Sequence, residues 1–519
     1  MLASERRRAA LVGVAAAAIA LATTEVVSAL GSPGPSLIDS VGTLVINLFG
    51  ASLKDAAVAL FGTNDKTALE VGIVAVCLFA GARLGAAALR RRAAGPVGMA
   101  VFGAIGVWAG LSDPLASPGR AIAASCLGAA AGSAAIVALL RQLRRMTPIN
   151  TGAADRPANA DPTVTEGSRR AFLGLLAASG GIAMAAAGAS QVLRRAATSA
   201  GNVAVRVLPT ARRVVGVPAS QPFAVSGISP YITPNDDFYR IDTALFVPRV
   251  NADSWHLEIR GRVERPYRVS YAELLSMDMV EEPVTLQCVS NEVGGSLVGT
   301  ASWLGVPLAD LLDRAGLKPG ATQIVGRSVD NFTVGFPTDV ALDGRTAMVA
   351  VGMNGEPLPQ RHGYPARLIV AGLYGYVSAT KWLREIELTR LQDFDAYWIP
   401  RGWAKKAPIK TASRIDVPRS GANLVAGPIP IAGVAWAPTR GISRVEVRID
   451  DGAWTEAQLG NVASNNTWVQ WTTTLNAAPG DHVLTVRATD GDGVVQTDDE
   501  APPQPDGATG YHTKSVRVR

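Results

Sequence analysis

The sequence predicts a multidomain protein: an α-helical transmembrane bundle, then a mixed α+β, mostly β domain, and then an immunoglobulin-like β-sandwich. Three observations predict this order. Long apolar runs are concentrated before residue 196, in a chain of 519 residues that is 48% hydrophobic and only 18% charged. From residue 226 onward, short β-branched runs are broken by Gly, Pro and Asp. After residue 418, short alternating strands follow one another between turn clusters.

The formal charge of +6 is unevenly distributed along the chain. Residues 1–195 hold 18 Lys and Arg against 10 Asp and Glu, a net charge of +8, and the rest of the chain has a net charge of −2. Because the excess positive charge lies in the apolar part, it indicates membrane orientation and gives no support to nucleic-acid binding. The high hydrophobicity excludes a disordered chain, and three cysteines are too few for a disulfide-stapled scaffold.

Five segments within the anchor, residues 1–195, are apolar and long enough to cross a bilayer, which takes about 20 residues. They are 9–30, 71–89, 93–112, 121–140 and 171–192. The run 36–62 is interrupted by charges, so we expect it to lie on the outer face or re-enter it. Five spans place all four arginine clusters in the cytoplasm, whereas a sixth would move Arg90–Arg92 outside. The chain is thus expected to be a multi-pass protein of the cell membrane, in contact with lipid, with its later domains on the extracytoplasmic side.

The last expected span begins with Arg169 and Arg170 in the sequence Ser-Arg-Arg-Ala-Phe-Leu. This pattern resembles a twin-arginine export signal placed inside the chain, and two ordinary positive-inside arginines explain it equally well. A small-residue stretch at 187–189 has the composition of a cleavage site, so the sequence leaves open whether this span stays attached. Residues 196–225 read as a linker without clear periodicity.

The two later domains have different patterns. In residues 226–420 we expect strands such as 255–263 and 347–352, with short helices at 271–275 and 308–315. In residues 421–519 the alternating runs are 434–437, 443–450, 467–475, 482–490 and 513–519. This density of short strands is typical of an antiparallel sandwich. Because it contains no titratable cluster, we expect a structural or dimerisation role for it.

Cys288 is the only cysteine after the expected spans, since Cys77 and Cys126 lie within two of them. An unpaired thiol in an oxidising compartment is a liability unless it is buried or binds something. A thiolate is a natural ligand for a transition metal, but one protein ligand cannot hold a metal ion. The sequence therefore leaves two interpretations, a buried inert thiol and a ligand to a metal whose other ligands come from a cofactor.

Around Cys288 the chain resembles the sulfite oxidase family of molybdopterin-dependent oxidoreductases, which also includes the catalytic subunit of the periplasmic methionine sulfoxide reductase. The resemblance lies in spaced blocks at 233–239, 286–291, 303–312, 362–367, 380–383 and 415–418. It implies a molybdopterin-binding catalytic domain over 226–420 and, after it, the family's dimerisation domain, hence a homodimer. Together the two cover roughly residues 226–519.

The resemblance also implies roles for individual residues. Cys288 would be catalytic and would bind molybdenum together with the pterin dithiolene. Arg367, Lys381 and the backbone N–H groups of Ala379 and Thr380 match the contacts of the pterin phosphate. The residues that match positions lining the pterin are His362, Asn235, Phe238, Tyr239 and Arg240, with Asp330 as a weaker match. Tyr397 matches an active-site tyrosine, although an ordinary interface aromatic fits almost as well.

One position departs from the family pattern. Sulfite oxidases carry an arginine five residues after the cysteine, and here that position is Val293, next to Glu292. Losing a cation there removes attraction for a dianion, so sulfite is disfavoured and a neutral sulfoxide or N-oxide gains support.

The resemblance therefore implies a membrane-anchored molybdenum oxidoreductase that moves an oxygen atom to or from a small-molecule oxo acceptor or donor. No histidine precedes His256, so no haem is expected in the bundle, and electrons would pass to an external carrier or a membrane redox subunit. The alternative is a non-catalytic membrane-anchored binding or interaction protein with a relic molybdopterin domain. Retention of Cys288, His362, Arg367 and Lys381 argues against that alternative.

Overall fold

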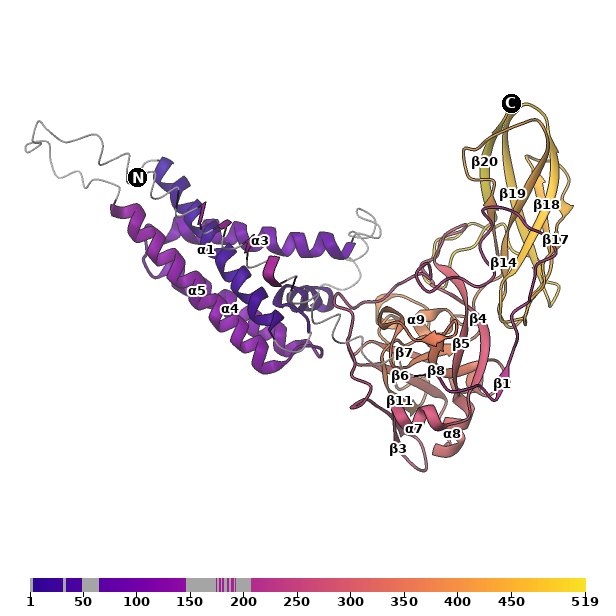
Figure 1. Ribbon diagram of the computed structural model, residues 1–519, viewed down its shortest axis with the longest axis horizontal. Coiled ribbons are helices and arrows are strands. Elements are labelled where there is room, and N and C mark those ends of the chain that lie inside the picture. The colour runs from indigo at the N-terminus through magenta and orange to yellow at the C-terminus, as the bar shows by residue number, and fades with distance from the viewer. Residues whose placement is uncertain are drawn as a thin grey trace, which may run out of the picture. The chain divides into compact units, whose positions relative to one another are not determined.

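The computed structural model describes residues 3–30, 34–48, 65–145 and 207–519, with scattered positions between 174 and 192. The chain forms two compact units (Figure 1). One unit comprises Met1–Ala204 and Ala244–Val247, and the other comprises Val205–Thr243 and Pro248–Arg519. The expected fifth span at 171–192 falls largely outside the described residues, and the arginine pair at 169–170 and residues 49–62 and 196–206 fall wholly outside them.

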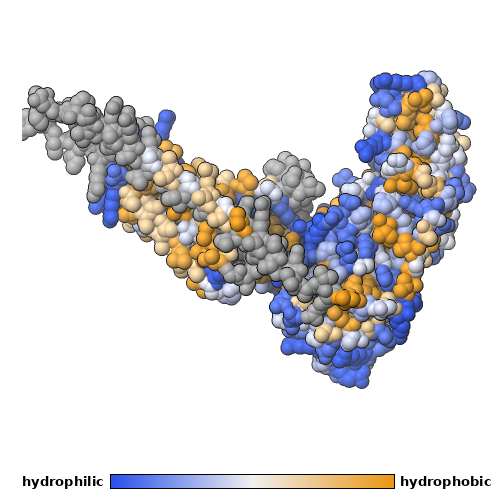
Figure 2. All heavy atoms as spheres, in the orientation of Figure 1, coloured by the Kyte–Doolittle hydropathy of each residue, from blue (hydrophilic) through white to orange (hydrophobic). Residues whose placement is uncertain are grey.

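Among its described residues the first unit contains four long apolar helices, α1 (Ala3–Ala29), α3 (Asp65–Ala88), α4 (Ala94–Ser112) and α5 (Pro118–Arg145). All four are long and apolar enough to cross a membrane, and they overlap four of the five expected spans. A shorter apolar helix, Leu37–Leu48, occupies the first half of the interrupted run. Figure 2 shows apolar side chains over much of the visible surface of these helices. Large apolar side chains such as Phe79 and Trp108 are exposed on them. A surface of this kind is suited to lipid.

Small residues allow the bundle helices to approach closely. A Cβ added to Gly13 of α1 would lie 1.9 Å from the carbonyl oxygen of Gly81 in α3, and one added to Gly85 would lie 2.1 Å from the carbonyl oxygen of Ala9. Such contacts are typical of small-residue packing between membrane helices. The Arg144 side chain donates to the carbonyl of Ala88 at 2.9 Å. The start of α1 and the ends of α3 and α5 therefore lie together, which places the clusters Arg6–Arg8, Arg90–Arg92 and Arg141–Arg145 at one end of the described bundle.

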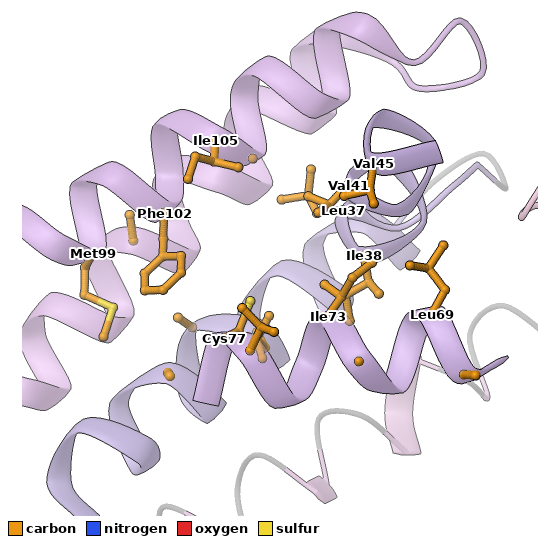
Figure 3. A pocket seen from close by; sticks show the side chains of 18 residues that line it. Leu37, Ile38, Val41, Val45, Leu69, Ile73, Cys77, Met99, Phe102 and Ile105 are labelled. Atoms are coloured by element: carbon orange, nitrogen blue, oxygen red, sulfur yellow. The ribbon is translucent and has the colours of Figure 1, made fainter. Parts of the chain in front are cut away.

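The bundle also contains a cavity of about 550 Å³. Side chains of α3, α4 and the helix Leu37–Leu48 line it, and every one labelled in Figure 3 is apolar or a thiol. Gly72 of α3 borders the cavity, and a Cβ added there would meet no atom within 4 Å. The close packing at Gly13 and Gly81 therefore does not extend to this part of α3.

The second unit begins with two sheets. The larger has the order β1-β4-β5-β8-β10, with β9 beside β8, and the other has the order β3-β2-β11-β6-β7. Their bounds are β1 (Arg213–Val214), β2 (His256–Gly261), β3 (Tyr267–Ser270), β4 (Val280–Gln287), β5 (Val298–Pro307), β6 (Gln323–Ser328), β7 (Thr333–Pro337), β8 (Ala347–Met353), β9 (Glu356–Pro357), β10 (Arg367–Val370) and β11 (Leu383–Thr389). Between them lie α7 (Tyr271–Ser276), α8 (Leu308–Ala315), α9 (Gly375–Ser378) and the 3₁₀ turns η2 (Thr338–Ala341), η3 (Gln360–His362) and η4 (Ile399–Arg401).

The expected elements of this domain are present. Helix α7 is fixed by a capping box between Ser270 and Glu273, and α8 buries Leu308 and Leu311 on one face before it ends at Gly316, whose φ is +68°. Strands β2 and β8 occupy the predicted β-branched runs. The short strand β1 pairs in parallel with β4, so part of the expected linker belongs to the larger sheet.

The chain ends in two further sheets, β12-β14-β18-β17 and β13-β20-β19-β15-β16, and the predicted fold class is confirmed. Their bounds are β12 (Ala412–Val417), β13 (Asn423–Leu424), β14 (Gly427–Trp436), β15 (Ile442–Ile449), β16 (Thr455–Glu456), β17 (Gln458–Leu459), β18 (Val469–Ala477), β19 (Gly480–Asp490) and β20 (His512–Val518). Strand β12 pairs with β14, so the sandwich includes residues before 421, the predicted first residue of this domain. Strand β14 begins earlier than expected. Its first part, which contains Pro428 and Pro430, pairs only with β18, and proline is tolerated where a strand has a neighbour on one side.

Candidate functional site

Cys288 follows the last residue of β4, where the β4–β5 hairpin opens into the loop 288–297. Its side chain is buried. The backbone N–H of Cys288 donates to the carbonyl of Leu297 at 2.9 Å, and its carbonyl accepts from the N–H of Asn291 at 3.0 Å. The Asn291 side chain accepts from the N–H of Leu297 at 2.7 Å. The hairpin and this asparagine together hold the thiol at a fixed place at the end of the strand.

Arg367, the first residue of β10, is a buried cation without a carboxylate partner among the described residues. One guanidinium nitrogen donates to the carbonyl of His362 at 3.0 Å, and the guanidinium carbon lies 4.9 Å from the ring centroid of Trp303. The Nε atom is buried and has no hydrogen-bond partner. Burial lowers the pKa of Arg367 to about 10. Because a buried charge without an opposite charge costs several kcal/mol, this site is suited to an anion.

The Thr380 hydroxyl lies beside β10 and is also buried without a hydrogen-bond partner. The carbonyl of Thr380 accepts from the N–H of Leu368 at 2.9 Å, next to Arg367. A Cβ added to Gly326 would lie 2.6 Å from this hydroxyl, so only glycine fits opposite it. The N–H of Ala379, by contrast, already donates to the carbonyl of Gly375 at 2.9 Å. The free donor capacity near Arg367 therefore lies in the Thr380 hydroxyl and not in the Ala379 amide.

Lys381 shares a buried carboxylate with Arg240. The Lys381 ammonium lies 2.9 Å from an Asp242 oxygen, and the Arg240 Nε lies 2.8 Å from the same oxygen. Burial lowers the pKa of Lys381 to about 8, although the Asp242 charge opposes the shift. Gly363, with φ +114°, separates the two buried cations, since a Cβ there would lie 3.0 Å from the Lys381 Cα and 3.2 Å from the Arg367 Cβ. Asp242 is thus the shared partner of Lys381 and Arg240. Because one negative charge faces two positive ones, this cluster keeps a net positive charge.

His362 and the aromatic residues after Asn235 pack against one another, and we call this cluster of rings the wall of the site. The His362 Nε2 lies 2.9 Å from the carbonyl oxygen of Asn235, and burial lowers the pKa of His362 to about 4, so the ring is neutral. The Phe238 ring meets the His362 ring edge-on at 5.8 Å and stacks on Tyr239 at 5.2 Å. Tyr239 is partly buried, and burial of its phenol, with a further contribution from the charge of Cys288, raises the pKa of that group. This electrostatic coupling links the wall to the thiol.

Asp330 and Tyr397 lie on the side of Asp242. Burial raises the pKa of Asp330, and the charge of Asp242 adds to that shift. The Tyr397 ring contacts Phe332 at 5.5 Å, and the Arg401 guanidinium carbon lies 3.8 Å from its centroid. Burial raises the pKa of Tyr397, and the Asp330 charge raises it further. The structure thus brings Asp330 and Tyr397 to the Lys381 side of the site.

Sequence reasoning missed three contributors to this geometry. Asp242 bridges Arg240 and Lys381, Trp303 faces Arg367, and Arg401 covers Tyr397. Asp242 and Arg401 had a local signal, since Asp242 follows Arg240 by two residues and Arg401 follows Tyr397 by four. The partner of Trp303 comes from another strand, so local spacing does not reveal it.

Comparisons with known proteins cover both domains of the second unit. Residues 244–398 match the family model "Oxidoreductase molybdopterin binding domain", and residues 412–486 match the model "Bacterial Ig domain". The mitochondrial sulfite oxidase of Rattus norvegicus is 29% identical over 272 residues, which are 44% of this chain and 49% of that protein. The chain therefore spans about half the length of this curated relative.

Two further proteins are similar over other extents. The uncharacterized oxidoreductase YuiH of Bacillus subtilis is 31% identical over 149 residues, which are 29% of this chain and 72% of that protein. The solved structure of the sulfane dehydrogenase SoxCD from Paracoccus pantotrophus has 23% identity and a TM-score of 0.49, covering 59% of this chain and 90% of that chain.

Proposed function

Since the chain belongs to the family of oxidoreductases with a molybdopterin binding domain, we propose that it is a membrane-anchored molybdenum enzyme. It would catalyse two-electron oxygen-atom transfer on a small molecule outside the cytoplasm, with electrons exchanged through an external carrier or a membrane redox subunit. The observation that carries this proposal is the buried Arg367 guanidinium, which has no carboxylate partner among the described residues and, like the Cys288 thiol, interacts electrostatically with the Tyr239 phenol.

The buried cations fit the phosphate end of a pterin cofactor. Arg367 and Lys381 would hold that phosphate, and the orphaned Thr380 hydroxyl would donate to it. An anion here would supply the opposite charge that Arg367 lacks. It would also give Lys381 a second anionic partner besides Asp242. His362, being neutral, would contribute hydrogen bonding or packing to the pterin without adding charge. Asn235, Phe238, Tyr239 and Arg240 would complete the pterin wall.

Cys288 fits the role of the protein's metal ligand. Over the described residues no group of three His, Cys, Asp or Glu side chains is close enough to hold a metal ion, so the remaining ligands would come from the cofactor. A molybdenum pterin bound here would supply oxygen-atom transfer with two-electron redox chemistry. The chain would supply a buried thiolate whose position is fixed by the hairpin, and the raised pKa of the Tyr239 phenol, which the charge of Cys288 helps to raise, disfavours a second negative charge near that thiolate.

A neutral substrate is proposed on the basis of Val293. This side chain is 36% exposed on the loop that carries Cys288, at the position where the resemblance places an oxyanion-binding arginine. An apolar side chain beside Glu292 offers no attraction to a dianion. We therefore propose a sulfoxide or an N-oxide as the oxygen donor in preference to sulfite as the acceptor.

The extracytoplasmic location is proposed from the arrangement of the basic clusters. The three clusters among the described residues, Arg6–Arg8, Arg90–Arg92 and Arg141–Arg145, lie at one end of the helices, and the positive-inside rule assigns that end to the cytoplasm. The end of α5 is then cytoplasmic, and the expected fifth span at 171–192 would carry the following domains across the membrane. A reporter enzyme fused after Arg519 should be active only when it folds outside the cytoplasm. Activity of a cytoplasm-only reporter at that position would overturn the assignment.

Metal analysis of the purified full-length protein, produced in cells supplied with molybdate, tests the enzyme proposal. We expect close to one molybdenum per chain, and turnover of a sulfoxide or N-oxide with an artificial electron donor. Cys288→Ser should lower that turnover by about 100-fold or more while the protein stays folded, whereas Cys126→Ser, which changes a cysteine of α5, should leave it unchanged. Molybdenum below a tenth of an equivalent in the wild type would instead favour a non-catalytic binding protein.

A further inference from the structure

The residue that precedes Cys288 is held by the C-terminal sandwich. The Gln287 side-chain oxygen accepts a hydrogen bond from the indole N–H of Trp436 at 2.8 Å. Both side chains are buried, and Trp436 is the last residue of β14. The same hydrophobic core contains Trp436 together with residues of the two sheets before it, so the contact is part of a continuous interior. The backbone immediately before the thiol is therefore fixed by a residue 149 positions later in the chain.

The other end of the Cys288 loop is held by Arg414 of β12. One guanidinium nitrogen donates to the carbonyl of Gly295 at 2.7 Å. The other two nitrogens are also engaged, with the Ser229 hydroxyl at 2.8 Å and an Asp416 oxygen at 2.7 Å. The side chains of Arg414 and Asp416 are only 11% and 9% exposed. Because Asp416 and Ser229 already fix the guanidinium, little additional conformational entropy is lost when it binds the loop.

His512, the first residue of β20, packs directly against the same loop. Its Nδ1 accepts from the backbone N–H of Ile415 at 2.9 Å, so the neutral ring carries its proton on Nε2. A Cβ added to Gly294 would lie 2.2 Å from the His512 Cδ2 and 2.3 Å from its Nε2. Gly294 also has φ +75°, which side-chain-bearing residues rarely adopt. Ring and loop thus fit each other only with glycine at this position.

From these contacts we infer that the sandwich serves the redox centre directly: Trp436, Arg414 and His512 are positioning residues that fix the loop carrying Cys288. The inference rests on the proposed function, in which this thiol is the metal ligand. A metal ligand must be held to within about 0.5 Å of its productive position. The β4–β5 hairpin by itself closes the loop 288–297 with only a few hydrogen bonds. The sandwich adds contacts at Gln287, Gly294 and Gly295, on both sides of the thiol. They also set the position of Val293, the proposed determinant of substrate charge.

The reactivity of the thiol tests this inference without any turnover. The experiment uses the full-length protein with Cys77→Ala and Cys126→Ala, produced without molybdate, so that Cys288 is the only thiol. We expect Arg414→Ala to raise the alkylation rate of Cys288 by maleimide about tenfold, because removing one charged hydrogen bond raises the open population of the loop by roughly that factor. Hydrogen exchange should accelerate in 288–297 and stay unchanged in β4 and β5.

Arg440→Ala is the matched control. Arg440 pairs with Asp490 at 2.9 Å within the sandwich, is similarly engaged with backbone and hydroxyl oxygens, and its hydrogen bonds go to residues outside the Cys288 loop. It should leave the alkylation rate at the wild-type value. Equal rates for the Arg414 and Arg440 variants and the wild type would overturn the inference.

His512→Gln provides a second variant in case Arg414→Ala does not fold. It removes the ring that packs on Gly294 and should raise the alkylation rate several-fold, in the same direction as Arg414→Ala. An unchanged rate would count against the inference. Failure of the proposed function gives a different result, because a wild type without molybdenum would leave these rate differences intact. If the proposed function and this inference both hold, the Arg414→Ala variant loaded with molybdenum should show a broadened Mo(V) electron paramagnetic resonance signal.

Discussion

The guanidinium of Arg367 lies over the Trp303 ring, 4.9 Å from its centroid, and is buried with one nitrogen unbonded. A tryptophan face stabilises a cation far less than a carboxylate does in the same place. The partly buried Arg327 of the same domain, by contrast, pairs with Glu385 at 3.0 Å and with Glu387. The contrast fits the proposed role of Arg367 as a residue kept for binding at a cost in stability.

Arg367→Met is expected to uncouple binding from stability. In protein produced without molybdate, removing the unpaired charge should raise the melting temperature by several degrees, equivalent to about 1–3 kcal/mol. In cells supplied with molybdate the same variant should retain little molybdenum. Arg327→Met is the control, since it breaks a paired network and should lower the melting temperature. A lower melting temperature for both variants would contradict the assignment of Arg367 as an unpaired cation.

Asp242→Asn should shift the pH range over which cofactor is retained. The pKa of Lys381 is lowered to about 8 by burial, and Asp242 holds it up. Without that carboxylate the pKa falls further, so Lys381 loses its charge at a lower pH and its attraction for a phosphate weakens. Molybdenum retention, measured after dialysis between pH 6 and 9, should therefore decline at a lower pH in the variant. Identical curves would show that Lys381 does not contribute charge to binding.

His512 makes stability depend on acid pH. Burial lowers its pKa to about 4, with the neighbouring charges of Lys514 and Arg414 acting in the same direction and Asp416 opposing them. Because the unfolded chain takes up a proton near pH 6.5 and the folded chain only near pH 4, the stability from the neutral ring is complete above about pH 6.5 and is lost as the pH falls toward 4. His512→Gln should therefore flatten the pH dependence of the unfolding free energy over this interval, as measured by urea denaturation. A slope equal to that of the wild type would contradict this account.

Gly72→Leu should stabilise the bundle, whereas Gly81→Leu should disrupt it. At Gly72 a new side chain would enter the cavity of about 550 Å³, and replacing a helical glycine adds about 1 kcal/mol by itself. At Gly81 a Cβ would lie 2.6 Å from the Ala17 Cβ and 2.7 Å from the Gly13 carbonyl oxygen. Thermal stability in detergent distinguishes the two, and equal effects of the two changes would argue against the described packing of α3.

Val293→Arg should change the preference for substrate charge. The position is 36% exposed, so a guanidinium fits there without burial, and it would attract a dianion. We expect kcat/KM for sulfite to rise about tenfold or more relative to a neutral sulfoxide, with the gain reduced by added salt. Val293→Met serves as the uncharged control of similar length. If the arginine variant and the methionine variant gave the same ratio, the charge at this position would not select the substrate.

Much of the architecture was predictable because burial has a local signature. Four apolar spans, the α8 bounds of Leu308–Ala315 and most sandwich strands follow from periodicity and turn residues. Pro428 and Pro430 interrupt that signature at the start of β14, and only the strand pairing shows that this part of β14 has a single neighbour, β18, where proline is tolerated. Cys288 was identified as a candidate because it stands alone, and Arg367 and Lys381 because their spacing resembles a family.

The sequence by itself determined the order of apolar, mixed and alternating segments, the basic clusters beside the helices, and the residue types at the site. Only the tertiary structure decided which charges meet. Asp242 pairs with two cations, whereas Arg367 has no carboxylate partner among the described residues. Arg414 donates to Gly295, which lies 119 positions earlier in the sequence. The physical reason is the sequence distance between interacting residues. Side-chain periodicity reports the burial of each residue within its own helix or strand. The electrostatics of the site depends on partners from distant strands, which only the packed sheets bring within hydrogen-bond distance.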